Sequence, residues 1–323
     1  MKRFMITMTC VIICTMCFSL SAFAAKEIKI IVKNTQLRPD SAPVIIQGRV
    51  MVPLRAVSEA LGASVEWNKQ TKTAAISKWS QKAWLTVGKK TALVTYGLFE
   101  PEEVPLDTSV KSLSNRVYVP LRFIAEQFGY NVNYANNTVS IQSPLNEAQR
   151  AKLYSGDLSV SRQIAIDTAY NGRNYRHTPL KTLHPYLDYS TAFLFPEGEA
   201  LRFFVIEGDE TITLFEYEDD FLVATWQAHF EEIGLDVFQQ LIGDRLKDRT
   251  GPTPKIGKPF LYYLENPFGG SNRKESGHID TDGSYTLIGY NNQSGGGPIE
   301  EFGTVSLVLP NEVRKESLEI PHN

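Results

Sequence analysis

Cysteine is scarce in this sequence, and all of it lies in a segment that the mature protein is expected to lose. The three cysteines stand within the first 17 residues. That segment has a positive start, an almost uncharged apolar run over residues 5–20, and small residues at Ala22 and Ala24. The pattern predicts a secretory signal peptide over residues 1–24 with cleavage near Ala24, and the short run disfavours a retained membrane anchor. A mature chain without thiols excludes disulfides, thiolate nucleophiles and cysteine-bound zinc.

Further long apolar runs and an excess of positive charge are also missing. No second apolar span follows the expected signal peptide, so we expect no membrane span in the mature chain. The formal net charge is −3 and becomes more negative once Lys2 and Arg3 are removed, which disfavours nucleic-acid binding. A phosphate-binding loop, a Gly-x-Ser-x-Gly elbow and a His-Glu-x-x-His helix are absent as well. We therefore expect a secreted or extracellular protein, with cell-wall association as one option.

What the chain does have is an internal duplication. Residues 49–62 return as residues 116–129, at an offset of 67. Within these stretches Glu59 falls on Glu126 and Gly62 on Gly129, and the same offset relates two further pairs beyond them, Val65 with Val132 and Trp67 with Tyr134. A match of this length indicates a duplicated structural unit.

Each copy predicts the same succession of short elements. An alternating, β-branched run leads into Pro53 or Pro120, where a proline suits the start of a helix. Apolar residues then recur at helical spacing up to Gly62 or Gly129, which stand where a helix ends with positive φ. A two-stranded hairpin follows in both copies. Because one helix and three short strands cannot cover their own apolar faces, we expect the two copies to pack together.

These residues resemble a known family. The doubled pattern V-P-L-R-x-[IVF]-[AS]-E-x-[LF]-G, followed by a hairpin that ends in isoleucine, is similar to the copper amine oxidase N-terminal-like, or stalk, domain. The resemblance covers about residues 26–143. It implies a small α/β module that exported bacterial proteins carry fused to unrelated partners, and that is non-catalytic even in the oxidases.

The resemblance does not extend to amine oxidase chemistry. In the oxidases, the quinone arises from a tyrosine in an Asn-Tyr-Asp/Glu setting, and three histidines, two of them in His-x-His, hold copper. Here Asn174-Tyr175-Arg176 lacks the acidic residue after the tyrosine, and the sequence has no His-x-His. We therefore expect no cofactor, no metal and no amine oxidase activity. The arginine–glutamate pairs of the two helices, at i and i+4, are more simply exposed ion pairs than a binding site.

The second half is predicted to be a separate domain. Residues 144–158 form a polar connector, and residues 159–323 form an uncharacterised α+β domain with a mainly antiparallel sheet, so the whole chain is classed as α+β. Helices are expected over residues 160–170 and 235–249. Strands are expected over residues 191–195, 201–206, 211–217, 221–228, 259–264, 278–280, 284–290 and 304–309. We expect the connector to be the least protected backbone, with trypsin cutting first at Arg150 or Lys152.

Metal-ligand and catalytic patterns are weak in this half. His177 and His184 share one predicted loop but have no third ligand at suitable spacing, so loop histidines are the better interpretation. The run from Asp280 to Ser284 resembles a calcium loop but lacks its third acid and its distant glutamate, which favours an Asp-Gly hairpin turn.

One aromatic group near a polar loop is the candidate binding site. Aromatic rings beside Asn, Glu and Ser are typical of sites that hold sugars or peptides. The expected ligand-binding residues are Trp226, Tyr263, Glu265, Asn266 and Tyr285. The alternative is that the rings fill the core of the sheet.

Three hypotheses for the function follow. The first is an exported, non-catalytic envelope or extracellular protein whose C-terminal domain binds a cell-wall glycan, a peptide or another envelope protein. The second is a secreted hydrolase of glycosides or cell-wall material, with an acid pair drawn from Glu216, Asp219, Glu231 and Glu265. The third is a purely structural envelope protein.

Overall fold

Strands make up most of the regular structure. The computed structural model describes residues 27–97, 99–183, 190–208, 210–232, 236–266, 271–294, 297–318 and 320–321. Strands account for 46% of the chain and helices for 15%, and the sheets are mainly antiparallel. The fold is therefore broadly α+β and rich in β-structure. The expected signal peptide, residues 1–24, and His184 lie outside the described residues.

The first half contains two short helices among short strands. Both copies of the repeat form the predicted succession of strand, helix and hairpin. Gly62 and Gly129, which follow the helices, have φ of 75° and 78°, a region that favours glycine. The elements are β1 (Lys29–Val32), β2 (Thr35–Leu37), β3 (Val44–Ile46), β4 (Arg49–Pro53), α2 (Leu54–Ala60), β5 (Ser64–Asn68), β6 (Thr73–Lys78), β7 (Gln81–Thr86), β8 (Thr91–Tyr96), β9 (Glu102–Pro105), β10 (Lys111–Leu113), β11 (Arg116–Pro120), α3 (Leu121–Gln127), β12 (Asn131–Ala135) and β13 (Thr138–Gln142).

The two copies are related by an approximate two-fold axis between β4 and β11. These strands pair antiparallel, with Val52 opposite Val119, Pro53 opposite Tyr118, and Met51 opposite Pro120. Val52 and Val119 are equivalent positions of the two copies, so the register maps each strand onto the other. The helices α2 and α3, which directly follow these strands, are related by the same approximate axis.

Strands of one copy complete sheets of the other. The hairpin β12–β13 of the second copy joins β1 and β2 in the order β12-β13-β1-β2, with β1 parallel to β13. The hairpin β5–β6 of the first copy leads the sheet β5-β6-β7-β8-β9, and the central sheet has the order β10-β11-β4-β3. Because the copies interlock in this way, we infer that neither is a complete folding unit alone.

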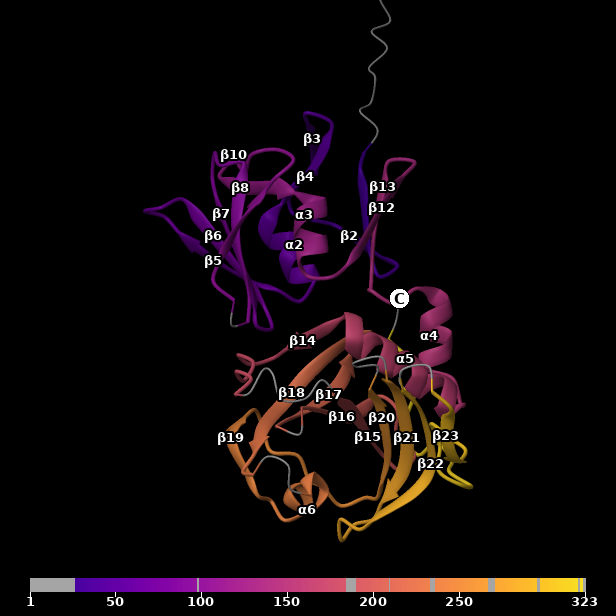
Figure 1. Cartoon of the computed structure of the whole chain (residues 1–323). Coiled ribbons are helices and arrows are strands. Elements are labelled where there is room, and N and C mark those ends of the chain that lie inside the picture. Colours follow the sequence, from indigo (N-terminus) through magenta and orange to yellow (C-terminus); the bar gives the residue numbers. More distant parts are fainter. Residues whose placement is uncertain are drawn as a thin grey trace, which may run out of the picture.

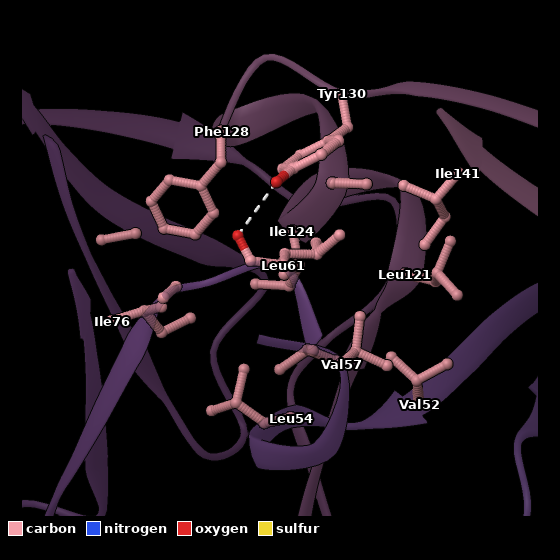
Figure 2. Packing of buried hydrophobic residues seen from close by; sticks show 14 of the residues in the cluster. Val52, Leu54, Val57, Leu61, Ile76, Leu121, Ile124, Phe128, Tyr130 and Ile141 are labelled. Atoms are coloured by element: carbon pink, nitrogen blue, oxygen red, sulfur yellow. Dashed lines mark hydrogen bonds between the residues drawn. The ribbon is translucent and has the colours of Figure 1, made fainter. Parts of the chain in front are cut away.

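One core lies between the helices and the sheets (Figure 2). Its helical side chains are the apolar residues that the repeat predicts: Leu54, Val57, Leu61, Leu121, Ile124 and Phe128. Burying each such side chain contributes about 1.5–3 kcal/mol. The Tyr130 hydroxyl also donates a hydrogen bond of 3.0 Å to the Leu61 carbonyl, which ties the end of the first helix to the second copy.

The second half is built on a large curved sheet (Figure 1). Its strands follow the order β14-β18-β17-β16-β15-β20-β21-β22-β23, with β19 also paired to β18. All neighbouring strands are antiparallel except β14 and β18. The elements are α4 (Glu147–Leu153), α5 (Leu158–Asn171), β14 (Arg173–Tyr175), β15 (Thr191–Pro196), β16 (Arg202–Glu207), β17 (Thr211–Glu218), β18 (Phe221–Phe230), α6 (Val237–Ile242), β19 (Leu246–Thr250), β20 (Phe260–Asn266), β21 (Ser271–Ile279), β22 (Tyr285–Ser294) and β23 (Ile299–Gly303).

The predicted elements of this half are partly confirmed. The helix over residues 160–170 lies within α5, and the first four predicted strands correspond to β15–β18. The helix predicted over residues 235–249 is wrong beyond Ile242. Asp244 has a φ of 56°, which reverses the chain, and residues 246–250 then pair with β18 as β19. The strand predicted over residues 304–309 is not found, and β23 forms just before it.

The apolar side chains of the connector are buried, although other residues in it, among them Glu147 and Lys152, are exposed. Leu145, Leu153 and Tyr154 are at most 7% exposed and form a small cluster with Ile164 of α5. The buried Asp220 accepts a hydrogen bond of 2.9 Å from the Tyr154 hydroxyl. The Arg150 guanidinium lies 2.6 Å from the same carboxylate. The connector helix α4 is thus fixed to the turn between β17 and β18.

The two halves also share a packed junction. Phe221 and Val223 of β18 belong to the core cluster of the first half, so that core is not covered by residues 26–143 alone. The Phe221 ring lies 4.8 Å from the Tyr130 ring and 5.0 Å from the Trp79 ring. Between these rings is the Lys78 ammonium, which donates hydrogen bonds to the Leu61 carbonyl and the Tyr130 hydroxyl. The division into two independent folding domains stays a prediction.

Candidate functional site

A groove of about 610 Å³ in the first half combines an aromatic ring with several charged groups. We call it groove 1. It lies between the turn after β2, the start of α2, the hairpin β5–β6 and the turn between β10 and β11. Its lining residues are Leu37, Arg38, Pro39, Asp40, Pro53, Leu54, Arg55, Ala56, Glu59, Val65, Trp67, Ala74, Ser112, Asn115, Arg116 and Val117.

The aromatic wall of groove 1 is Trp67, near the end of β5. Trp67 pairs with Ala74 of β6, which in turn pairs with Leu85 of β7, so all three side chains lie on one face of the sheet. Ala74 and Leu85 are buried, whereas Trp67 is 38% exposed because it stands at the margin of the sheet. The indole therefore presents an accessible surface to the groove.

Three arginines and two carboxylates line the same groove. Arg116 lies 2.5 Å from Asp40, and Arg55 lies 4.0 Å from Glu59 at i and i+4 of α2. Within the described residues Arg38 makes no ion pair. Its guanidinium is exposed and retains its donors for a ligand. The groove thus offers one cation more than it has anions.

A second groove of about 310 Å³ lies at the positions that the repeat makes equivalent. We call it groove 2. Its lining residues are Ile45, Gly48, Arg49, Val50, Asp107, Pro120, Leu121, Arg122, Val132, Tyr134 and Val139. Tyr134 occupies the position of Trp67, and Arg122 occupies the position of Arg55. Both grooves are therefore products of the duplication.

The ion pairs of the two grooves cross between the copies. Arg116 of the second copy pairs with Asp40 of the first, and Arg49 of the first copy pairs with Asp107 of the second at 2.9 Å. The offset of 67 relates Arg49 to Arg116 and Asp40 to Asp107. Each ion pair is therefore the counterpart of the other. These pairs are largely exposed, so each contributes at most about 1 kcal/mol to stability. Their constant placement fixes one guanidinium and one carboxylate at the edge of each groove.

The grooves differ in three respects. Groove 1 has the larger volume, and its ring is an indole rather than a phenol. Arg38 has no counterpart in groove 2, because the equivalent position is Pro105. Groove 1 is therefore the better equipped of the two for an anionic ligand.

The residues predicted as a binding site in the second half do not form one exposed surface. Trp226 is fully buried and packs with Phe204, at 6.3 Å between ring centroids, on the sheet face covered by α6. Tyr263 is buried in the cluster on the opposite face, beneath α5. These two rings lie in the two cores of the sheet, which is the alternative that the sequence left open.

The other predicted residues lie near β20–β22. The Tyr285 ring packs 5.5 Å from Tyr262 and 5.6 Å from Phe238, and its hydroxyl donates a hydrogen bond of 2.5 Å to Glu275. Glu265 forms an ion pair of 2.6 Å with Lys274, and Asn266 stands opposite Arg273 in the ladder. Whether these residues contact a ligand stays a prediction.

Sequence reasoning considered the Arg–Glu pairs of the helices only as exposed ion pairs. Arg55–Glu59 and Arg122–Glu126, at 4.0 and 3.6 Å, are indeed exposed. The stronger signal was the shared offset of Trp67/Tyr134, Asp40/Asp107 and Arg49/Arg116. Both copies have an aromatic residue in the hairpin and an arginine and an aspartate at equivalent positions. This repeated combination indicates the two grooves.

Metal and membrane features are not found among the described residues. In that part of the chain no group of three or more His, Cys, Asp or Glu side chains is placed to hold a metal ion. None of its helices has the length and apolar character needed to cross a membrane.

Comparison with known proteins agrees with the architecture of the first half. Residues 31–143 match the copper amine oxidase N-terminal domain. The family resemblance predicted over about residues 26–143 is thus confirmed. The matched segment contains both copies of the repeat and both grooves.

A relative covers a similar share of the chain. A Brevibacillus choshinensis protein described as a protease inhibitor is 30% identical to this chain over 118 residues. The match spans 36% of this chain and 34% of that protein, so about a third of each is compared.

Proposed function

We propose that the protein is a non-catalytic binding protein that acts outside the cytoplasm and holds a carboxylate-bearing glycan in groove 1. The proposal rests on one observation: the half-exposed Trp67 ring and the unpaired Arg38 guanidinium lie in the same groove. The expected signal peptide supports the location. The family resemblance supports a non-catalytic role.

The ring supplies the apolar part of sugar recognition. One face of a pyranose ring is lined with C–H groups, which stack on an aromatic surface and release water from both. Trp67 is accessible at the sheet margin, and it is held there by the packed hairpin beneath it. Such a fixed ring binds a ligand without a large ordering cost.

The charges favour an acidic sugar over a neutral one. A guanidinium donates two parallel hydrogen bonds to a carboxylate, an arrangement that an ammonium cannot match. Arg38 is available for this contact, while Asp40 is positioned to accept hydrogen bonds from sugar hydroxyls. Ser112 and Asn115 add short polar side chains to the lining.

The same carboxylates argue against hydrolysis in this groove. A glycosidase needs one carboxyl group that keeps its proton until it protonates the leaving group. Asp40 and Glu59 are each engaged in an ion pair, with Arg116 and Arg55 respectively. Two of the four acids suggested for a hydrolase in the second half are also engaged, since Asp219 pairs with Lys33 and Glu265 with Lys274.

A peptide is the competing occupant of groove 1. The name of the Brevibacillus choshinensis relative points to a protein ligand for that protein. An extended peptide would add to a strand edge, and the edge strands that contribute to groove 1 or its rim are β2 and β10, of three residues each, and β5, of five residues. Edges of three to five residues give a peptide few backbone hydrogen bonds. The glycan is therefore the better supported ligand.

Calorimetric titration of the mature protein with trigalacturonate tests the proposal, with neutral maltotriose as the control ligand. We expect trigalacturonate to bind in a salt-sensitive manner and maltotriose to bind much more weakly. Arg38→Ala removes a charge-assisted contact and should weaken binding about tenfold or more. Trp67→Ala should weaken it by a similar factor.

Two control variants decide where binding occurs. Trp84 is a half-buried tryptophan on the opposite face of the same sheet, so Trp84→Ala should leave the affinity unchanged. Tyr285→Ala tests the ligand site predicted in the second half. A protein that ignores trigalacturonate, or that loses binding through Tyr285→Ala and not through Trp67→Ala, would contradict the proposal.

A further inference from the structure

Groove 2 has the chemistry of groove 1 without a role in the proposed function. Both grooves present one aromatic ring at a hairpin margin, one helical arginine and one Arg–Asp pair that crosses between the copies. In groove 2 the ring is Tyr134, which is 46% exposed. Three kinds of side chain recur together at equivalent positions.

The two-fold relation determines how ligands in the two grooves are oriented. The axis lies between Val52 and Val119, and it maps β4 onto the antiparallel β11. A ligand bound in groove 1 is therefore mapped onto one that runs in the opposite direction in groove 2. A glycan chain has two different ends, so one straight chain cannot present the same direction to both grooves.

We propose that groove 2 is a second, weaker site for the same carboxylate-bearing glycan, so that the domain bridges two chains running in opposite directions. This inference rests on the proposed function of groove 1. The domain then acts as a cross-linker of glycan chains, which one groove could not achieve.

The weaker affinity of groove 2 follows from its composition. It lacks the counterpart of Arg38, its ring is a phenol, and its volume is about half that of groove 1. Loss of one charge-assisted contact alone reduces affinity about tenfold or more. The net charge of the lining is nonetheless positive, since Arg49 and Arg122 outnumber Asp107.

Calorimetry with trigalacturonate measures the number of sites. The mature protein should bind two molecules, with dissociation constants that differ about tenfold or more. Tyr134→Ala and, independently, Arg122→Glu should remove the weaker site and leave the stronger one unchanged. Both positions are exposed, so the variants should keep the melting temperature of the parent protein.

Light scattering with polygalacturonate measures bridging. The mature protein should raise the scattering of the long polymer, with a maximum at intermediate protein concentration, whereas Tyr134→Ala should bind the polymer without this rise. A stoichiometry of one, with binding and scattering unaffected by Tyr134→Ala and Arg122→Glu, would overturn the second site while leaving groove 1 intact. Absence of all trigalacturonate binding would instead overturn the proposed function and this inference with it.

Discussion

Lys78 is a lysine whose ammonium lies among three aromatic rings. Its ammonium lies 4.2 Å from the Trp79 ring centroid, 4.5 Å from Tyr130 and 4.6 Å from Phe221, so residues of both halves surround it. Burial, together with the charge of Lys33, lowers the pKa of Lys78 to about 7. The ring faces oppose this shift because they attract the charged form. The junction between the halves should therefore respond to pH.

The sign of this response follows from proton linkage. The unfolded chain binds a proton on Lys78 up to the ordinary value of 10.5, whereas the folded chain releases it from about pH 7 upward. The free energy of unfolding should therefore rise between about pH 7 and pH 9.5, by at most about 1.4 kcal/mol per pH unit from this group. Urea unfolding across this range measures the slope.

Lys78→Met is the matched variant because it keeps an unbranched side chain of similar length without the titrating amine. It should reduce the slope. A smaller slope should remain, because burial also lowers the pKa of Lys33, whose ammonium pairs with Asp219. Identical slopes in the two proteins would contradict the assignment to Lys78.

At the scale of single elements, the connector helix α4 shows how polar residues can fix a short helix through hydrogen bonds and an ion pair. Asn146 begins it with a capping box, in which its side chain accepts from the Gln149 N–H and the Gln149 side chain accepts from the Asn146 N–H. Arg150, which looks like an exposed connector residue in the sequence, donates a hydrogen bond of 2.6 Å to the Pro321 carbonyl and lies 2.6 Å from Asp220. The helix is thereby fixed from two sides.

Limited proteolysis distinguishes this docked helix from the exposed connector that the composition predicts. Trypsin should cut slowly at Arg150 and Lys152, because cleavage requires local unfolding of α4. It should cut earlier at Lys255, which is exposed in the irregular segment between β19 and β20. Mass spectrometry of early time points gives the order. First cleavage at Arg150 or Lys152, with two fragments that each melt cooperatively, would restore the original expectation.

Elements with local sequence signals could be predicted, whereas elements formed by tertiary contacts could not. The repeat was readable because its signals are local: helical apolar spacing, a glycine at positive φ, and paired asparagines such as Asn136 and Asn137, which both have positive φ in the hairpin turn. The end of α6 was missed because an apolar helical pattern continues past Gly243, while the pairing of residues 246–250 with β18 is a tertiary contact. Sequence patterns do not report such contacts directly.

At the scale of the whole molecule, the type of an aromatic residue does not tell whether its side chain is buried or exposed. Trp226 and Tyr263 satisfy the composition of a binding site but fill two cores, whereas Trp67 stands at a sheet margin that only the assembled hairpins define. The junction was hidden for a similar reason. Phe221 belongs by sequence to the second half and by packing to the core of the first.

The proposed ligand site is groove 1 in the first half, and the tryptophan indoles provide a direct test because Trp67 lines this groove. The chain has four tryptophans, of which Trp67 lines groove 1, Trp79 lies at the junction, Trp84 lies on the outer face of its sheet and Trp226 lies in the second core. Their indole N–H signals, assigned by single Trp→Phe substitutions, can be followed by NMR during titration with trigalacturonate. We predict that the Trp67 signal shifts and saturates while the Trp226 signal stays in place. A stationary Trp67 signal beside a shifting Trp226 signal would contradict the account.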